Sequence, residues 1–454
     1  MRRFLFHNFR FVFFIDRWIR QRFTPAGGLV LSGLIAAGVF GIDTRQTLAY
    51  QLFSLLLALL LLAIISSWFI RQRLTAQREL PKFATVGEPL SYRIQVQNHT
   101  DKLQLGISLR DNVKLHPPSF ERFLRAKEPG HQKRNWFDNF VGYPRWVWLM
   151  YISKGAEIAE QSLPPIPPSN AAPETLSRGE EGLDVKMLLT PLRRGYVDFS
   201  GMTFACPEPF GLFNTLYRID KPDKLLVLPK RYPVHNISLS GCRKYQRGGV
   251  HLAMSVGDAE EFVSLREYRP GDPLRHIHWK SWAKVGKPIV KEFQEEFFVR
   301  HALILDTFTE QVDGEFFEAA VSVAASVASS PRSQEVLLDL MFVGTEAYCF
   351  TSGRGLAQVD GLLEVLASIE ACIDQPFSQL YPLVMEHAAS LSGCVCVLLS
   401  WDDARQHLIQ SLKQAGIPLL VIIVSQNPLE IDSEKFPFVH VVYTDKIAEN
   451  LADL

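Results

Sequence analysis

An excess of charge of one sign is the first feature that this chain of 454 residues lacks. It has 48 lysines and arginines against 48 aspartates and glutamates, so its formal net charge is zero. Proteins that bind nucleic acid need an excess of cations, because neutralising phosphates supplies much of their affinity. The composition therefore gives no reason to expect a nucleic-acid partner. At this length and 47% hydrophobic residues, the chain has room for two or three domains.

The common catalytic motifs are also missing. There is no G-x-x-x-x-G-K-[ST] run to cradle a nucleotide phosphate, and the glycines of residues 353–355 lack the strand-to-helix setting that a phosphate loop requires. Neither a G-x-S-x-G elbow nor an H-E-x-x-H pair occurs, and no cysteine has an identifiable catalytic partner. We therefore expect no ATP hydrolysis, no resident cofactor and no enzymatic activity.

Two long runs near the N-terminus, residues 25–42 and 47–70, contain no charged side chain. At about 1.5 Å of rise per residue, each run approaches or exceeds the roughly 30 Å of a hydrocarbon core. The sequence therefore predicts a transmembrane helical hairpin over residues 25–73. The first run is rich in glycine, and we expect these small residues to lie where the two helices pack.

Arginines flank these two runs. Those before the first run are Arg2, Arg3, Arg10, Arg17, Arg20 and Arg22, and those after the second are Arg71, Arg73 and Arg78. By the positive-inside rule both termini lie in the cytoplasm, and we expect the protein in the inner (cytoplasmic) membrane of the cell, in contact with the lipid bilayer. A cleaved signal peptide is the alternative, but the apolar run begins too far from the start of the chain.

The N-terminal segment of residues 1–24 is both basic and aromatic. It carries phenylalanines and a tryptophan among its arginines, a composition found in helices that lie in the headgroup plane of a bilayer. The alternative is that this segment simply extends the first transmembrane helix.

After the membrane hairpin, residues 81–235 show the period-two alternation of a β-sandwich. Residues 90–98 and 103–111 are predicted as its first two strands. The stretch at about 112–181 is too long for a hairpin loop and contains a run of aromatic residues. We interpret it as an insert that binds a partner or touches the membrane, or else as a flap packed on the sandwich.

From residue 299 to the end, apolar strands alternate with helical patterns. Runs such as residues 301–308 and 418–425 contain near-continuous apolar stretches, as expected of parallel strands covered on both faces. Residues 299–454 are therefore predicted to form an α/β domain with a doubly wound parallel sheet. Cys394 and Cys396 lie in one such strand, and we interpret them as packed side chains rather than as a metal pair.

The segment of residues 236–298 joins these two domains and is dense in arginine, tryptophan and histidine. Its P-G-D-P run predicts a turn in which Asp272 caps a helix and Pro273 takes the first helical position. On that helix, Arg275, Trp279 and Trp282 would share one face. Glycine and proline then end the helix, and a strand follows from residue 289.

This segment resembles the signature of the domain of unknown function 58 family. The residues that carry the resemblance are Glu261, Phe262, Leu265, Arg266, Tyr268, Gly271, Asp272, Arg275, Ile277, Trp279, Lys280 and Glu292. A run like P-F-G-L-F also precedes the signature in that family; here it is residues 209–213, after Glu208 where an aspartate is usual. The resemblance implies a von Willebrand factor A-like domain at residues 299–454 and a partner of the MoxR-type AAA+ ATPase class.

We predict a binding surface on the signature segment. Its residues are Arg266, Tyr268, Asp272, Arg275, His278, Trp279 and Lys280. In one hypothesis the arginines pair internally, Asp272 with Arg275 and Glu267 with Arg266, and clamp the sandwich to the α/β domain. In the other, Arg, Trp and Tyr dock another protein, because these side chains are favoured at interface hot spots.

A metal site is the remaining possibility. In metal-binding members of the A-like fold the first strand ends in D-x-S-x-S, whereas residues 306–310 here read D-T-F-T-E. Phe308 and Glu310 therefore replace two hydroxyl ligands, and hard cations need several converging oxygens. We expect a metal-free site, with Asp306, Glu310, Asp402 and Asp403 as weak metal candidates.

The sequence thus favours a membrane-anchored cytoplasmic adaptor or scaffold protein. By the resemblance, it would work with a MoxR-type AAA+ ATPase and with other membrane or envelope proteins in the assembly or maturation of protein complexes or the cell envelope. The alternative is a metal-dependent binding or hydrolytic protein that uses the carboxylates around Asp306.

Overall fold

The polypeptide forms two compact units. The first is built mainly from Met1–Lys230, with Leu363–Ile369, and the second is built from most of the residues from Arg231 onward. The computed structural model describes residues 1–40, 47–69, 72–115, 117–126, 128, 134–168, 183–234, 260–272, 274–295, 300–309, 315–330, 337–352, 356–373, 375–426, 429, 431 and 435–452.

Three helices open the first unit: α1 (Arg2–Arg22), α2 (Pro25–Phe40) and α3 (Thr47–Ser67). Of the described helices, one is long and apolar enough to cross a membrane, over Leu48–Ser67. α2 is also apolar, but its 16 residues at about 1.5 Å each fall short of a hydrocarbon core of roughly 30 Å. Of the two expected spans, α3 therefore has the length and composition to cross a membrane, and the second span is not confirmed.

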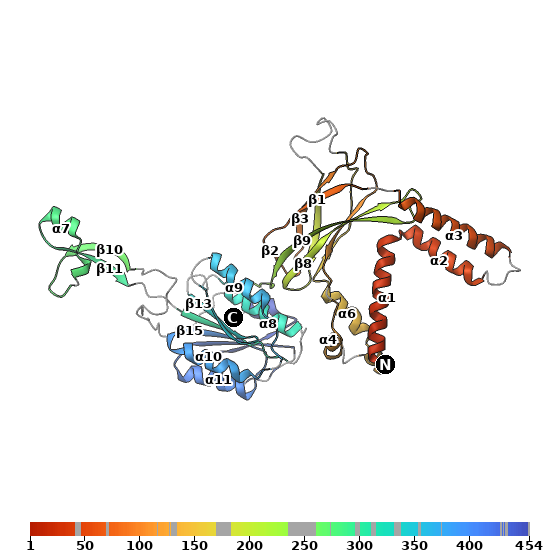
Figure 1. Ribbon diagram of the computed structural model, residues 1–454. Helices are drawn as coiled ribbons and strands as arrows, with labels where there is room; N and C mark the ends of the chain where they lie inside the picture. Colours follow the sequence, from red (N-terminus) through yellow and green to blue (C-terminus); the bar gives the residue numbers. More distant parts are fainter. Residues whose placement is uncertain are drawn as a thin grey trace. The chain divides into compact units, whose positions relative to one another are not determined.

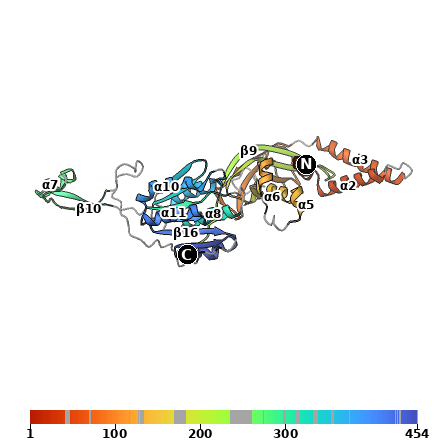
Figure 2. The ribbon, with the colours of Figure 1, turned by 90° about the horizontal axis from the view of Figure 1, so that it is seen from below.

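α2 and α3 lie side by side in both views (Figures 1 and 2). A Cβ added at Gly33 would lie 3.4 Å from the side chain of Leu56, and one at Gly38 would lie 3.4 Å from Phe53. Both glycines therefore lie where the helices pack, as the sequence predicts, because the missing Cβ lets the two backbones approach.

Two sheets of the first unit form a β-sandwich. The four-stranded sheet has the order β1 (Leu74–Glu79), β3 (Leu90–Asn98), β7 (Leu183–Pro191) and β5 (Ala156–Ile158). The five-stranded sheet has the order β2 (Phe83–Thr85), β9 (Asn214–Leu228), β8 (Gly195–Pro207), β4 (Ser108–Val113) and β6 (Gln161–Ser162). Side chains of both sheets share one core, in which Ile94, Met187 and Phe204 are fully buried.

The predicted strands of the sandwich are found with two differences. β3 is the predicted strand of residues 90–98, and its buried positions alternate as expected of a half-buried strand. β4 begins at Ser108 rather than at residue 103. β1 lies before residue 81, where the sandwich was predicted to start. The sequence pattern did not indicate this strand, because its last inward-facing position is the charged residue Arg78.

The insert contributes three short helices: α4 (Phe120–Arg125), α5 (Trp136–Val141) and α6 (Tyr143–Ser153). They share a core with α1, in which Phe6 lies 5.5 Å from Phe123 and 5.4 Å from Trp146 between ring centroids. This core is separate from the core of the sandwich. Phe123 and Trp146 of the insert therefore pack on the N-terminal helix, a partner that neither sequence interpretation named, while Trp136 and Phe137 are 78% and 65% exposed.

The second unit contains a six-stranded sheet. Its strand order is β14 (Ala347–Ser352), β13 (Leu337–Val343), β12 (Arg300–Leu305), β15 (Gly393–Leu398), β16 (Leu419–Ser425) and β17 (Val439–Tyr443). Strands β13, β12, β15, β16 and β17 are parallel neighbours, as the apolar runs predict. β14 is antiparallel to β13, because residues 344–346 between them make only a tight turn and leave no room for a crossover.

Helices cover both faces of this sheet. Helices α8 (Glu315–Ala328) and α9 (Leu356–Ser368) lie on one side of it, and helices α10 (Leu380–His387) and α11 (Asp403–Gln414) lie on the other (Figure 1). Helix α12 (Ile447–Ala452) follows the last strand. Cys394 and Cys396 are buried free thiols in β15, which confirms their interpretation as packed strand residues.

Candidate functional site

The predicted binding segment folds as a hairpin that carries a short helix, here called the signature hairpin. β10 (Glu260–Glu267) pairs antiparallel with β11 (Ile289–Glu295), and a 3-10 turn (Leu274–His276) and helix α7 (Trp279–Val285) lie between them along the chain (Figure 1). Ile277 and Val290 are buried and bridge one another. This β-bridge ties the turn to strand β11.

One ion pair holds the turn of the signature hairpin. The Arg266 guanidinium donates to both carboxylate oxygens of Asp272, at 2.7 and 2.8 Å, and the amide of Arg269 donates to the same carboxylate at 2.8 Å. The hydrogen bonds from Arg266 and then from the Arg269 amide lower the pKa of Asp272 to about 2. Asp272 thus stays ionised near neutral pH and fixes the turn rather than capping a helix.

α7 begins later than predicted, at Trp279, with His278 as its N-cap. Arg275 lies in the preceding 3-10 turn, so the expected helical face of Arg275, Trp279 and Trp282 does not form. The two tryptophans do stack, with ring centroids 5.2 Å apart. Trp279 is nevertheless 65% exposed, so the stack presents an aromatic face to its surroundings.

The internal pairing expected for the clamp is not found. Arg266 pairs with Asp272, and Glu267 pairs with Lys287 at 3.1 Å. Arg275 is exposed and donates to His276 Nε2 at 3.1 Å; no ion pair joins it to any carboxylate among the described residues. The Arg266–Asp272 and Glu267–Lys287 ion pairs thus each join two residues of the signature hairpin.

The other predicted residues lie on the same hairpin. Tyr268 is half-buried beside β10, where its amide donates to Pro288 O at 2.9 Å. His278 Nδ1 lies 2.6 Å from Ser281 Oγ, and Lys280 is exposed on α7. All seven residues of the predicted surface thus lie on the signature hairpin. Exposed Arg275 and Lys280 lie close to Trp279 along the chain.

The edge of the six-stranded sheet carries the predicted carboxylates. Asp306 follows β12 and is fully buried. Its Oδ1 accepts from the Phe308 amide at 3.1 Å, and its Oδ2 accepts from the Leu399 amide at 3.0 Å and from Arg405 Nε at 2.5 Å. Burial raises the pKa of Asp306, while Arg405 and the two amides oppose that rise.

Arg405 lies in the first turn of α11 and joins the two carboxylates Asp306 and Asp402. Its guanidinium also pairs with Asp402 and lies 4.5 Å from the ring centroid of Phe377. Its own burial would lower the pKa of Arg405, but the hydrogen bonds and charges of Asp306 and Asp402 raise it. A guanidinium therefore supplies the positive charge beside Asp306.

The metal candidates do not converge on an open position in the described residues. Asp306 and Asp402 are held by Arg405, Asp403 is an exposed residue of α11, and Glu310 lies outside the described residues. Phe308 is buried and its ring packs on Phe377 with centroids 5.5 Å apart. A cation at Asp306 would have to displace Arg405.

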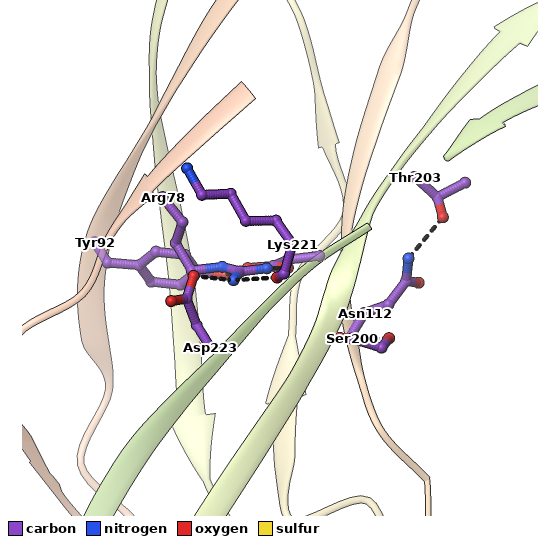
Figure 3. A network of polar contacts seen from close by, with 8 residues as sticks. Arg78, Tyr92, Asn112, Ser200, Thr203, Lys221 and Asp223 are labelled. Carbon is purple, nitrogen blue, oxygen red and sulfur yellow. Dashed lines mark hydrogen bonds and ion pairs between the residues drawn. The ribbon is translucent and has the colours of Figure 1, made fainter. Parts of the chain in front are cut away.

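Sequence reasoning missed a buried polar network inside the sandwich (Figure 3). Arg78 of β1 pairs with Asp111 of β4 and, at 2.7 Å, with Asp223 of β9, and Tyr92 donates to Asp111 at 2.7 Å. Burial first, and then Asp111, raise the pKa of Tyr92. The network joins the two sheets. The sequence gives one sign of this network. Arg78 lies two residues after Ala76 and four after Leu74, so in a strand its side chain faces inward with theirs.

Comparison with known proteins supports the resemblance in part. A family model described as Protein of unknown function DUF58 matches residues 264–379, from the signature hairpin into the six-stranded sheet and its helices. The uncharacterized protein YeaD of Bacillus subtilis (strain 168) is 25% identical over 194 residues, which are 42% of this chain and 47% of YeaD. The match thus spans about half of that relative, and neither description states an activity.

Solved structures give no argument about the fold. One match is the native conformation of E. coli alpha-2-macroglobulin, at a TM-score of 0.18 and 13% identity, over 38% of this chain and 8% of that one. Another is a cohesin module from a Clostridium perfringens family 33 glycoside hydrolase, at a TM-score of 0.15 and 8% identity, over 35% of this chain and 98% of the module. Both TM-scores are below 0.5, so neither match bears on the architecture of this chain.

Proposed function

We propose that the protein is a membrane-anchored cytoplasmic adaptor or scaffold rather than an enzyme. It would hold protein complexes or envelope proteins during their assembly or maturation and would work with a MoxR-type AAA+ ATPase that supplies the ATP-driven work. The ATPase partner is taken from the family resemblance, which the match of residues 264–379 supports at the level of the family alone.

The observation that carries the proposal is the exposed apolar surface around Trp279 on the signature hairpin. Leu274, Trp279 and Val285 are 68%, 65% and 58% exposed, while Ile277 and Val290 of the same hairpin are buried. The Arg266–Asp272 pair fixes the turn, so little conformational entropy would be lost on binding. A rigid tryptophan with exposed arginine and lysine neighbours is the composition favoured at protein-protein hot spots.

The helices and their flanking charges support the proposed location. α3 is long and apolar enough to anchor the chain, and α2 packs against it. We propose that both cross the inner membrane, α2 with local thinning of the bilayer or with part of the following segment. By the positive-inside rule, the flanking arginines support a topology in which both termini and the two units are cytoplasmic.

We further propose that the six-stranded sheet belongs to a von Willebrand factor A-like domain. Its order, with β12 and β15 central and an antiparallel strand at the β14 edge, supports this assignment. Domains of this architecture place ligands at the carboxyl ends of the strands. Because Arg405 already neutralises the carboxylates there, we propose protein binding without a metal.

Affinity capture tests the proposal. We expect Trp279→Ala and Arg275→Ala in the detergent-solubilised full chain to weaken capture of an AAA+ ATPase by at least about 2 kcal/mol each, or roughly thirtyfold in affinity, as hot-spot truncations do. Both residues are exposed, so the melting temperature should stay close to that of the unsubstituted chain.

Tyr196→Ala is the matched control, because Tyr196 is an aromatic residue of β8 that is 60% exposed outside the signature hairpin. It should leave capture unchanged. Capture that survives both hairpin substitutions in a protein of normal stability would refute the assignment of this surface.

A further inference from the structure

Helix α1 has two apolar stripes. The first, Phe6, Phe9 and Phe13, packs in the core that α1 shares with α4 and α6. The second consists of Phe4, Phe11 and Trp18, which are 73%, 65% and 53% exposed. These three are seven residues apart, and at 3.6 residues per turn they return to nearly the same side of the helix. The described residues leave this second stripe mostly uncovered.

Positive charge accompanies the uncovered stripe. α1 contains six arginines and a single aspartate in RRFLFHNFRFVFFIDRWIRQR. Arg2, Arg3 and Arg10 are exposed, and exposed Arg20 pairs with Asp16 at 2.9 Å. Aromatic side chains and arginines on one exposed helix are the composition of helices that lie in the headgroup layer, where anionic lipids attract the cations.

The end of α1 is tied to the start of α2. Phe23 and Thr24 alone separate the two helices. Thr24 Oγ1 donates to Gly211 O at 2.6 Å, and its amide donates to Leu212 O at 3.2 Å. A Cβ added at Gly27 would lie 1.9 Å from Leu212 O. The first turn of α2 is thus pressed onto the loop of residues 208–215.

Glu208 builds the loop that receives these helices. Its buried carboxylate accepts from the amides of Leu212, at 2.6 Å, and of Phe210 and Phe213. The same loop receives the end of α3, because Ser66 Oγ donates to Glu208 at 3.4 Å and Thr215 Oγ1 donates to Ser67 O at 3.3 Å. The loop of residues 208–215 therefore contacts the link that follows α1, the start of α2 and the end of α3.

This junction sets the direction of α1. Figure 1 shows α1 running across the direction of α2 and α3, with the corner at the link of residues 23–24. If α3 crosses a bilayer, α1 cannot follow it into the hydrocarbon and is held along the surface.

Further arginines gather at the corner. A cavity of about 200 Å³ is lined by Arg20 and Arg110 and by Thr24 and Pro25 at the start of α2. Burial lowers the pKa of Arg17, and the like charges of Arg110 and Arg218 lower it further. Glu160, which accepts from Arg110, is the acidic residue in this lining. Crowded arginines beside the first turn of α2 suit an additional anion such as a lipid phosphate.

We propose that α1 is an interfacial helix that binds the anionic phospholipid surface of the membrane, with Phe4, Phe11 and Trp18 in the headgroup layer and its arginines on the lipid phosphates. The inference rests on the anchoring part of the proposed function, because α3 must bring α1 to the bilayer. It is independent of the ATPase partner. It gives the basic aromatic N-terminal segment a ligand.

A second copy of the chain fits this face less well. Joining two such helices would place six arginines and one aspartate against the same set, and like charges in contact are repulsive. An anionic surface instead complements the arginines, and α3 brings it within reach of the corner.

The test uses the full chain in lipid nanodiscs. Trp18 emission is taken as the difference between the wild-type chain and Trp18→Phe, which isolates one of eight tryptophans. Quenching by brominated phosphatidylglycerol in a phosphatidylcholine disc is compared with quenching by brominated phosphatidylcholine at the same mole fraction. We expect Trp18 to be quenched, and more strongly by the anionic lipid.

The double variant Arg3→Gln/Arg10→Gln should then lower the preference for the anionic lipid by about fivefold for each arginine removed. Lys186→Gln/Lys224→Gln removes the same charge from exposed residues of the sandwich and should leave the preference unchanged.

Quenching without preference for the anionic lipid would overturn the lipid assignment. Absence of quenching in a chain that remains in the disc would overturn the inference, whether a second copy or a protein covers Trp18. A chain that does not enter discs at all would instead refute the anchor itself.

Discussion

Arg405 gives the carboxyl edge of the six-stranded sheet a fixed positive charge. It pairs with Asp306 and Asp402 and is itself 6% exposed. A guanidinium remains protonated and is part of the chain, whereas a bound metal ion dissociates when the concentration of free metal falls. The charge of Asp306 is thus balanced permanently, which suits a structural role better than a ligand-controlled one.

The Arg405→Ala substitution tests this role. It would leave the buried Asp306 without its counter-charge, and breaking a buried pair from one side costs about 3 to 5 kcal/mol. We expect faster amide hydrogen exchange in peptides that cover β12 and β15 of the detergent-solubilised chain, measured by mass spectrometry. The double variant Arg405→Met/Asp306→Asn removes both charges and should exchange more slowly than Arg405→Ala.

Magnesium distinguishes this interpretation from the metal-dependent alternative. Because Arg405 holds both carboxylates, millimolar Mg²⁺ should leave exchange in the wild-type chain unchanged. Protection of β12 by Mg²⁺ in the wild-type chain would favour the metal-dependent protein instead.

Arg78 shows how a single residue limits prediction from the sequence. The alternation of β1 is regular, but its last inward position is arginine, which sequence patterns assign to the surface. Arg78 is buried because Asp111 and Asp223 arrive from β4 and β9, far along the chain. Burial alone would lower the pKa of Arg78, and the two carboxylates raise it. No local pattern contains partners so distant.

At the scale of elements, α2 depends on a close backbone contact. The Cβ of Gly27→Ala would meet the Leu212 carbonyl at 1.9 Å, so α2 or the loop of residues 208–215 must move. We expect a lower melting temperature for the detergent-solubilised chain, because overpacking typically costs about 1 to 3 kcal/mol.

Gly28→Ala is the matched control for this prediction, since a Cβ there meets nothing within 4 Å. By helix propensity it should be neutral or stabilising, by up to about 1 kcal/mol. Equal melting temperatures for the two variants would show that α2 does not rest on the loop in the folded protein.

Elements with a strong local period were predicted well, and elements set by partners were not. The strand of residues 90–98 and the apolar strands of the six-stranded sheet follow from alternation or continuous hydrophobicity. The start of α7 was predicted too early, because Asp272 binds the Arg266 side chain and the Arg269 amide rather than helix amides. The predicted surface residues do share one hairpin, but their pairing could not be read from spacing alone.

At the scale of the whole molecule, the proposals require one topology. The adaptor needs the signature hairpin on the side of the membrane where ATP and an AAA+ ATPase are present, and α1 needs an anionic leaflet beside it. The cytoplasmic leaflet carries such charge. Both requirements are met if each terminus is cytoplasmic, as the arginines around the two apolar runs predict.

Reporter fusions test this topology in the intact chain. A C-terminal fluorescent protein should be bright and a C-terminal alkaline phosphatase inactive, because the phosphatase needs disulfides that form outside the cytoplasm. A phosphatase fused within residues 41–46, between the two apolar helices, should be active.

The flanking arginines determine this topology in the proposal, so replacing Arg71, Arg73 and Arg78 should weaken the preference for a cytoplasmic C-terminus. Arg78→Gln should also loosen the sandwich, because Arg78 pairs with Asp111. An active C-terminal phosphatase would place both units outside the cytoplasm, away from ATP, and would remove the adaptor and its ATPase partner together.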